Sequence, residues 1–254
     1  MIHTGLISIT FRQLNPAEII SLVNQVGFEG IEWGGDIHVP HGDVTRAKEV
    51  RRMTADAGLV ATSYGSYYEA GVSEENGLAF DAVLDAAVAL DVPVIRIWAG
   101  TVDSVDADET YRANVVEDIQ RIATLADRAG KRLAIEFHRM SLADTKESTL
   151  KLIEEISREN VRMFWQPPNG KDTAFCLQTL EALLPWLENV HVFQWDGQEN
   201  RHPLVEGQAA WSKYLITAVT TEKDHYAMIE FVPDDDPDQF LHDADILKSW
   251  IDAL

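Results

Sequence analysis

Residues 5–33 contain two strands and the helix between them, in the sequence GLISITFRQLNPAEIISLVNQVGFEGIEW. The runs Gly5–Ile9 and Gly30–Trp33 have strand character, and the apolar residues of the segment between them recur at helical spacing. Asn15 is a suitable N-cap, Pro16 suits the first helical position, and Gly27 suits a left-handed cap at the C-terminal end. The stretch therefore predicts a β–α–β unit.

The same alternation continues along the chain. Further apolar runs with strand character occur at Leu59–Ser63, Val92–Trp98, Arg132–His138, Val161–Gln166, Val190–Trp195 and Tyr226–Val232, and a helical segment follows each, the last being Pro237–Leu254. Alternating strands and helices imply parallel pairing, because a parallel neighbour needs a crossover connection. Eight such units in 254 residues have the size of a (β/α)₈ TIM barrel, and we expect a single domain over residues 1–254. The alternative, a doubly wound open sheet, usually has fewer strands and a glycine-rich turn that this chain lacks.

Composition excludes several classes of function. The chain is 46% hydrophobic and can bury a large core, but it has 42 acidic against 21 basic residues and a net charge of −21. That balance argues against nucleic acid and anionic membranes as partners, because both attract clustered Lys and Arg. The single cysteine, Cys176, cannot form an internal disulfide. No apolar run reaches the ~20 residues of a membrane span, and the N-terminus lacks signal-peptide features, so we expect a cytoplasmic protein.

In a barrel of this kind the functional site lies at the C-terminal ends of the strands and in the loops that follow them. Polar residues at the predicted strand ends are Glu32, Ser63, Tyr64, Arg96, Glu136, His138, Gln166, His191, Gln194 and Glu230, and the adjoining loops add Asp36, His38, His41, Arg201 and His202. These residues are the candidates for chemistry.

Three of the candidates suit a metal ion. Glu136 and Glu230 come near the ends of apolar strands, where an ionised carboxylate is costly unless a cation or hydrogen bonds compensate it. With His191 on the strand between them in sequence, they form a set suited to a hard divalent ion. The alternative is that each glutamate pairs with an Arg or Lys and that His191 is an ordinary core residue.

Aromatic and loop residues suggest a sugar-like ligand. Trp33 and Trp98 end predicted strands, and indole faces suit the apolar faces of sugar rings, although core filling is the alternative. His38 is a candidate substrate contact, which we favour over a separate metal site formed by Asp36, His38 and His41. Arg201 could hold a hydroxyl or anionic group, or it could be a solvated surface charge.

Four segments, Gly27–Trp33, Leu133–His138, Val190–Gln194 and Met228–Phe231, in this order along eight units, resemble the xylose isomerase-like TIM barrel (sugar phosphate isomerase/epimerase) family. The resemblance covers essentially the whole chain. It implies one Mn²⁺, Mg²⁺, Co²⁺ or Zn²⁺, held by glutamate, aspartate, histidine and glutamate from strands 5, 6, 7 and 8. Glu136, His191 and Glu230 match three of these positions. Arg201 matches a family arginine that often contacts substrate.

The sequence departs from the family pattern on strand 6, where Gln166 stands in place of the usual aspartate. Gln194 likewise replaces an acid that commonly follows the strand 7 histidine. A glutamine carbonyl can still coordinate a metal, but Glu136 and Glu230 then supply a charge of −2 where a third acid would give −3. We therefore expect one divalent ion, Mn²⁺ first, bound less tightly than is usual in the family.

The leading functional hypothesis is a metal-assisted isomerase or epimerase of a sugar or sugar-like polyol. Glu136 and Glu230 would move a proton next to a carbonyl, one on each face of the substrate. Arg96, His138 and Arg201 would hold its hydroxyl groups. A lyase is the nearest alternative, because the same enolate can expel a β-hydroxyl. A non-catalytic carbohydrate-binding barrel or subunit is the second. The family resemblance also allows a homodimer, whereas DNA-repair endonuclease activity is disfavoured by the net charge.

Overall fold

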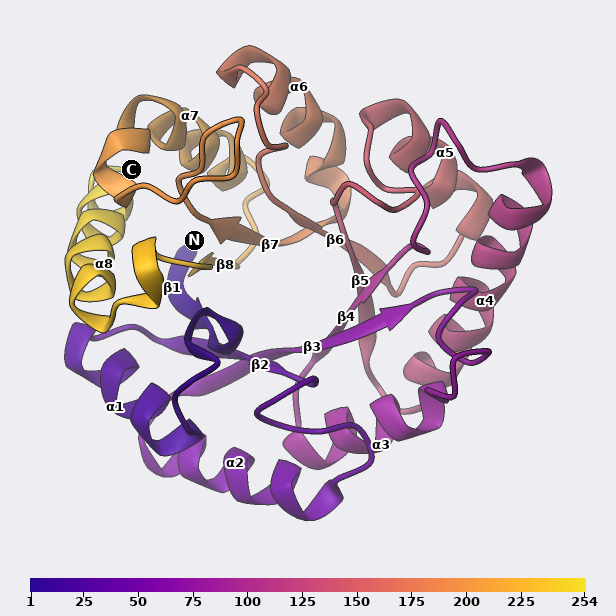
Figure 1. Cartoon of the computed structure of the whole chain (residues 1–254), viewed down its shortest axis with the longest axis horizontal. Helices are drawn as coiled ribbons and strands as arrows, with labels where there is room; N and C mark the ends of the chain where they lie inside the picture. Colours follow the sequence, from indigo (N-terminus) through magenta and orange to yellow (C-terminus); the bar gives the residue numbers. More distant parts are fainter.

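The computed structural model describes residues 1–254 and contains a closed barrel of eight parallel strands (Figure 1). The strands are β1 (Ile2–Ile7), β2 (Gly30–Gly34), β3 (Val60–Glu69), β4 (Val94–Trp98), β5 (Arg132–Glu136), β6 (Val161–Trp165), β7 (Leu187–Val192) and β8 (His225–Ile229). Each strand pairs with the next along the chain, and β8 pairs with β1. Closure confirms the predicted TIM barrel and excludes the open sheet.

Eight helices form a ring around the barrel (Figure 1). They are α1 (Pro16–Val26), α2 (Val44–Asp56), α3 (Phe80–Leu90), α4 (Glu109–Arg128), α5 (Lys146–Ile156), α6 (Thr173–Leu183), α7 (Gln208–Val219) and α8 (Pro237–Asp252), with short 3₁₀ helices at Ser8–Phe11, Leu184–Trp186, Leu204–Gly207 and Pro233–Asp235. None of the helices has the length and apolar character needed to cross a membrane.

The first unit has the predicted caps. The Asn15 side chain accepts hydrogen bonds from the backbone of Ala17 and Glu18, and the Glu18 carboxylate accepts one from the Asn15 backbone in return. Gly27 ends the helix with φ of 70°, a left-handed conformation that glycine adopts without steric cost. Local sequence therefore sets both ends of α1.

Several strands end earlier than their apolar runs predict. β5 ends at Glu136, β6 at Trp165 and β8 at Ile229, so His138, Gln166 and Glu230 lie in the loops that follow. The apolar runs continue into these loops because loop residues such as Phe137 are also buried. β3 differs in the other direction, since it continues to Glu69 rather than ending at Ser63.

Apolar side chains fill two regions. A cluster of 60 buried residues includes apolar residues of all eight helices and packs the helices against the outer face of the barrel. A second cluster lies inside the barrel and consists of Ile7, Ile9, Val94, Ala134, Phe164 and Met228. This inner cluster closes the barrel interior, and the polar residues at the C-terminal strand ends lie above it.

Candidate active site

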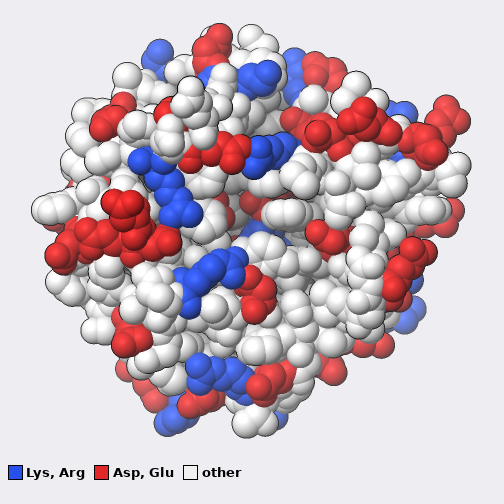
Figure 2. All heavy atoms as spheres, in the orientation of Figure 1, with Lys and Arg blue, Asp and Glu red and all other residues white.

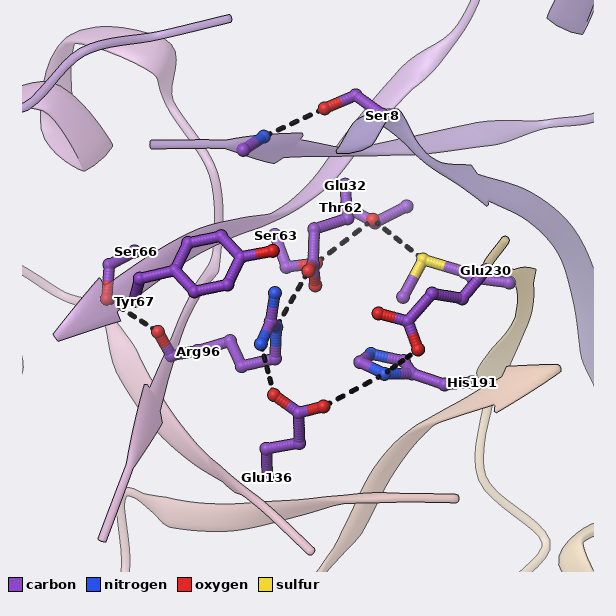
Figure 3. A network of polar contacts seen from close by, with 12 residues as sticks. Ser8, Glu32, Thr62, Ser63, Ser66, Tyr67, Arg96, Glu136, His191 and Glu230 are labelled. Atoms are coloured by element: carbon purple, nitrogen blue, oxygen red, sulfur yellow. Dashed lines mark hydrogen bonds and ion pairs between the residues drawn. The ribbon is translucent and has the colours of Figure 1, made fainter. Parts of the chain in front are cut away.

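Buried charged residues from five strands converge at the C-terminal end of the barrel (Figure 3). Glu32 lies on β2, Arg96 on β4 and His191 on β7, while Glu136 is the last residue of β5 and Glu230 directly follows β8. All five side chains are at most 8% exposed. Because side chains alternate along a strand, Glu136 and Arg96 share the inward face with Ala134 and Val94 of the inner cluster.

Glu136, His191 and Glu230 form a group that could hold a divalent metal. One ligand atom from each lies within 4.8 Å of the other two. His191 Nδ1 is 3.5 Å from a carboxylate oxygen of Glu136 and 3.5 Å from one of Glu230, too far for strong hydrogen bonds. Both ring nitrogens of His191 are buried without a hydrogen-bond partner. A buried imidazole without partners between two carboxylates fits a divalent cation.

The same carboxylates raise the proton affinity of His191. Burial would lower the pKa of this imidazole, but Glu230 and Glu136 outweigh burial and raise the pKa to about 10. Burial would raise the pKa of Glu136, but Arg96 and His191 outweigh it and hold that pKa well below its usual range. A proton on His191 therefore compensates the two carboxylates where a metal ion would otherwise do so.

Arg96 joins two acids across the barrel mouth. Its Nε donates to Glu32 at 2.8 Å, and its Nη1 donates to Glu136. Ser63 donates to the other oxygen of Glu32 at 2.7 Å, which fixes that carboxylate in place. The remaining nitrogen, Nη2, is buried without a partner. Glu136 therefore pairs with an arginine, as the alternative from the sequence predicted, and it is also a member of the metal group.

Glu136 also accepts two further hydrogen bonds. Trp98 Nε1 donates to Oε2 at 2.5 Å, and Gln166 Nε2 donates to Oε1 at 3.1 Å. Gln166 thereby lies next to the metal group, and its carbonyl oxygen is the only atom of its amide able to coordinate a cation. Gln194, the other glutamine where the family resemblance predicts an acid, is turned away, because its Oε1 lies close to where a Cβ on Gly207 would be, in the 3₁₀ helix before α7.

A cavity of about 750 Å³ opens above these residues. Figure 2 shows the hollow at the centre of this face, with acidic and basic atoms at its floor and Lys and Arg around its mouth. Its lining includes Trp98 and His138, whose rings stack with centroids 4.6 Å apart and planes 18° apart. Of the predicted substrate-binding residues, Arg96, Trp98 and His138 line this cavity.

Three other predicted substrate contacts lie outside the lining. Trp33 is fully buried between barrel and helices. The ring nitrogens of His38 contact Ser8 Oγ at 2.9 Å and the Leu14 carbonyl at 3.2 Å. Arg201 pairs with Asp235 and packs over the ring of Phe231, which separates it from the cavity.

The loop after β2 does not gather a second metal group. His41 Nε2 contacts the Ser66 carbonyl at 2.6 Å, and Asp36 pairs with Arg12. His202 contacts Asp196 and Glu206, each at 3.3 Å, away from the barrel centre. These residues make contacts within the loops around the cavity and do not form a metal site.

Sequence reasoning missed most loop residues of the lining, and Tyr67 and Arg12 are two of those that carry polar groups. Tyr67 lies beyond the predicted end of its strand, and Arg12 follows the first strand within a loop. The ring centre of Tyr67 lies 5.1 Å from the Arg96 guanidinium, and Figure 3 shows the phenol beside the end of the Arg96 side chain. No local motif distinguishes Tyr67 from the neighbouring Tyr64 and Tyr68.

The model of the xylose isomerase-like TIM barrel family matches residues 20–250. The chain belongs to this family. A curated relative, a 3-dehydroshikimate dehydratase of Bacillus anthracis, is 25% identical over 288 residues, covering 98% of this chain and 95% of the relative. The predicted family resemblance is confirmed.

Solved structures share the fold over the whole chain. The structure of a probable 3-dehydroshikimate dehydratase from Bacillus anthracis has a TM-score of 0.82 at 22% identity, covering 97% of this chain and 98% of the other. A D-allulose 3-epimerase from Methylomonas sp. has a TM-score of 0.73 at 14% identity, covering 98% of each chain. A xylose isomerase-like TIM barrel protein from Mycobacterium smegmatis, in complex with magnesium, also has 0.73 at 14%, covering 99% and 97%.

Proposed function

We propose that this chain is a metal-dependent dehydratase of a cyclic hydroxy ketone, with 3-dehydroshikimate as the first substrate to test. The full-length similarity to a 3-dehydroshikimate dehydratase supports this choice of substrate. The choice between lyase and epimerase rests on the environment of Glu136. The proposal therefore differs from the leading hypothesis from the sequence, which was an isomerase or epimerase with the lyase as the alternative.

The hydrogen bonds to Glu136 carry the proposal. An epimerase that works by two bases needs a proton acceptor on each face of the substrate. Glu136 already accepts hydrogen bonds from Arg96, Trp98 and Gln166, so both of its oxygens are engaged. Its pKa is held below the usual range by Arg96 and His191, despite burial. Such a carboxylate is a weak base, which argues against an epimerase that uses Glu136 as one of its two bases.

His138 is our candidate for the base of the dehydratase. Its Nδ1 contacts the Arg139 carbonyl, so this nitrogen carries the hydrogen when the ring is neutral, and Nε2 keeps a free lone pair. Stacking on Trp98 holds the ring at the cavity wall. The histidine that the sequence assigned to hydroxyl binding thus has the geometry of a proton acceptor.

Glu136, His191 and Glu230 would hold the cation, with the Gln166 carbonyl as a neutral fourth group. When bound, a divalent ion supplies Lewis-acid polarisation of a substrate carbonyl and so acidifies the neighbouring C–H. His138 would take the proton from the carbon next to that carbonyl. The C–O bond of the β-hydroxyl then breaks, a C=C bond forms, and the hydroxyl leaves as water with the proton that His138 returns.

A carboxylated substrate suits the charge of the lining. Arg96 and Arg139 each pair with acids, Arg96 with Glu32 and Glu136, and Arg139 with Glu199. Lys171 instead rests with its Nζ 5.4 Å from the centre of the Phe175 ring. It is therefore a cation of the lining that is available to the carboxylate of 3-dehydroshikimate.

Epimerisation of a ketose stays the second candidate, because Glu230 lines the cavity opposite Glu136, with His191 between them. The Glu230 carboxylate does not accept the hydrogen bonds from Arg96, Trp98 and Gln166 that the Glu136 carboxylate accepts. In this scheme Glu230 and His138 would be the two proton carriers. The D-allulose 3-epimerase with the same fold gives D-allulose and D-fructose as the substrates to test.

The test is to incubate the purified protein, with Mn²⁺ or Mg²⁺ added, with 3-dehydroshikimate and to follow product mass. We expect loss of one water and a catechol carboxylate as product, and we expect His138→Asn to reduce kcat by roughly 10²- to 10⁴-fold. In parallel, D-allulose and D-fructose are incubated in D₂O. Solvent deuterium at a ketose carbon, with 3-dehydroshikimate unchanged, would instead establish the epimerase.

A further inference from the structure

β3 contains a bulge at the mouth of the cavity. Gly65 of β3 lies opposite Arg96 of β4, but the next paired residues are Tyr68 and Ile97. Two residues of β3, Ser66 and Tyr67, therefore lie between positions that are adjacent on β4. Tyr67 has φ of 53°, in the left-handed region that a bulky residue rarely adopts. Bulges beside active sites commonly re-aim a side chain.

Surrounding contacts hold the bulge in place. Ser66 Oγ donates to the Arg96 carbonyl at 2.6 Å and accepts from the Tyr68 backbone at 3.2 Å. The Ser66 carbonyl contacts His41 Nε2 at 2.6 Å. A conformation that is unfavourable for tyrosine thus persists because hydrogen bonds on both sides of it fix the chain. The strain is local to Tyr67, which points into the cavity.

The phenol of Tyr67 packs against residues of the site. Its ring centre lies 5.1 Å from the Arg96 guanidinium and 6.0 Å from the Trp98 ring, and Figure 3 shows it extending over Arg96. Arg12 Nη2 donates to the phenol oxygen at 3.4 Å. That contact uses the oxygen as an acceptor, and the hydroxyl donates no hydrogen bond to any group of the chain.

The other two tyrosines of β3 differ in this respect. Tyr64 donates its hydroxyl to the Val39 carbonyl at 2.7 Å, and Tyr68 donates to Asp118 at 2.9 Å. Burial raises the pKa of Tyr67 above its usual value, so its hydroxyl stays protonated. Tyr67 is therefore the tyrosine of this strand that lines the cavity and has a hydrogen left to donate.

We propose that Tyr67 is a substrate-binding and specificity-determining residue that donates a hydrogen bond to an acceptor oxygen, carbonyl or carboxylate, of the ligand in this cavity. The inference rests on the proposed function for the identity of that ligand. Arg12, paired with Asp36 and in contact with the phenol oxygen, positions the hydroxyl from behind. A ligand that lacks an acceptor oxygen at this point leaves the hydroxyl unpaired and is rejected.

Tyr67→Phe tests the proposal, because it removes the hydroxyl and keeps the ring over Arg96. Tyr68→Phe is the matched control, since it removes a hydroxyl one residue away that bonds outside the cavity. With 3-dehydroshikimate as substrate and Mn²⁺ at saturation, we expect Tyr67→Phe to lower kcat/KM by about 10- to 100-fold, the usual effect of one hydrogen bond to a charged or polarised oxygen. The Mn²⁺ Kd should not change, and Tyr68→Phe should keep the wild-type kcat/KM.

Equal kcat/KM for wild type and Tyr67→Phe would overturn the proposal. Calorimetric titration of the Mn²⁺-loaded protein with 3-dehydroshikimate and with D-fructose tests the role of Tyr67 separately from the proposed function. A wild type that binds 3-dehydroshikimate without dehydrating it, or that binds only D-fructose, contradicts the dehydratase, yet a 10-fold or greater rise in the Kd of the bound probe in Tyr67→Phe still supports the role of Tyr67. A wild type that binds neither probe contradicts both.

Discussion

The side-chain amide of Gln166 donates a hydrogen bond to Oε1 of Glu136 at 3.1 Å. The residue directly after β6 therefore gives a neutral donor to a carboxylate of the metal group, at the position where the family resemblance predicts an acid. The bond stabilises Glu136 without a metal, and it leaves the group with a charge of −2 from Glu136 and Glu230.

We predict that Gln166→Asp tightens metal binding. The substitution removes the donor and adds a third carboxylate, so the metal-free site loses stability through repulsion while the loaded site gains an anionic ligand. The Mn²⁺ Kd should fall by at least about 10-fold, which corresponds to ~1.4 kcal/mol. Calorimetric titration measures it, and Gln194→Asp, directed away from the group, is the control. An unchanged or higher Kd in Gln166→Asp would contradict the position of Gln166 beside the cation.

Metal binding should also release a proton from His191. The pKa of this imidazole is raised from 6.5 to about 10 by Glu230 and Glu136, against burial, whereas a ligand nitrogen must be deprotonated. Between about pH 6.5 and 10, Mn²⁺ titrations in buffers of different ionisation enthalpy should show close to one proton released. His191→Gln should release none. Equal heats in all buffers for the wild type would argue against this coupling.

The raised pKa of His191 also predicts the direction in which the stability of the metal-free protein changes with pH. Because the pKa of folded His191 lies above its unfolded value, its contribution is fully present below pH 6.5 and is lost as the pH rises towards about 10. Urea unfolding of the metal-free protein should therefore show a falling free energy of unfolding over this range. His191→Gln should flatten that slope, and a slope equal to that of the wild type would assign the pH dependence to other groups.

Glu32→Gln should destabilise the barrel mouth. The glutamine keeps the shape but has a single acceptor oxygen, which can serve Arg96 Nε or Ser63 but not both, and the buried guanidinium loses one of its two carboxylates. We expect a loss of about 1–3 kcal/mol in the free energy of unfolding, measured in urea. Glu29→Gln, whose carboxylate is 51% exposed beside His3, is the control and should change stability by less than about 1 kcal/mol. Equal effects of the two substitutions would contradict a special role for the buried pair.

Gly65→Ala should displace Arg96. A Cβ at this position would lie 2.7 Å from Arg96 Nη2 and 2.7 Å from Glu32 Oε1, both well inside van der Waals contact. Arg96 is fully buried and held at both ends, so we expect a loss of about 1–3 kcal/mol in unfolding free energy and a lower kcat/KM. Gly197→Ala, whose Cβ would meet only the Gly170 Cα at 3.4 Å, should be tolerated in the same unfolding assay. Wild-type stability in Gly65→Ala would show that the guanidinium has room to move.

The family and most of the metal group could be predicted from local sequence. Glu136 and His191 lie on short strands that pair in register with their neighbours, so their position in the chain fixes their height in the barrel. Gln166 could be identified as a departure for the same reason. Trp33 and His38 were less predictable, because strand alternation and loop conformation decide whether a side chain faces the cavity or the helices.

The sequence by itself determined the eightfold alternation, and with it the barrel and the rim on which the polar residues meet. Apolar periodicity and capping residues act over a few positions, so they can be recognised without the fold. Only the tertiary structure decided that Arg96 links Glu32 to Glu136 and that a bulge in β3 directs Tyr67 into the cavity. Those relationships depend on residues that are 30 or more positions apart, or on a strained backbone held by such contacts, and no local pattern encodes them.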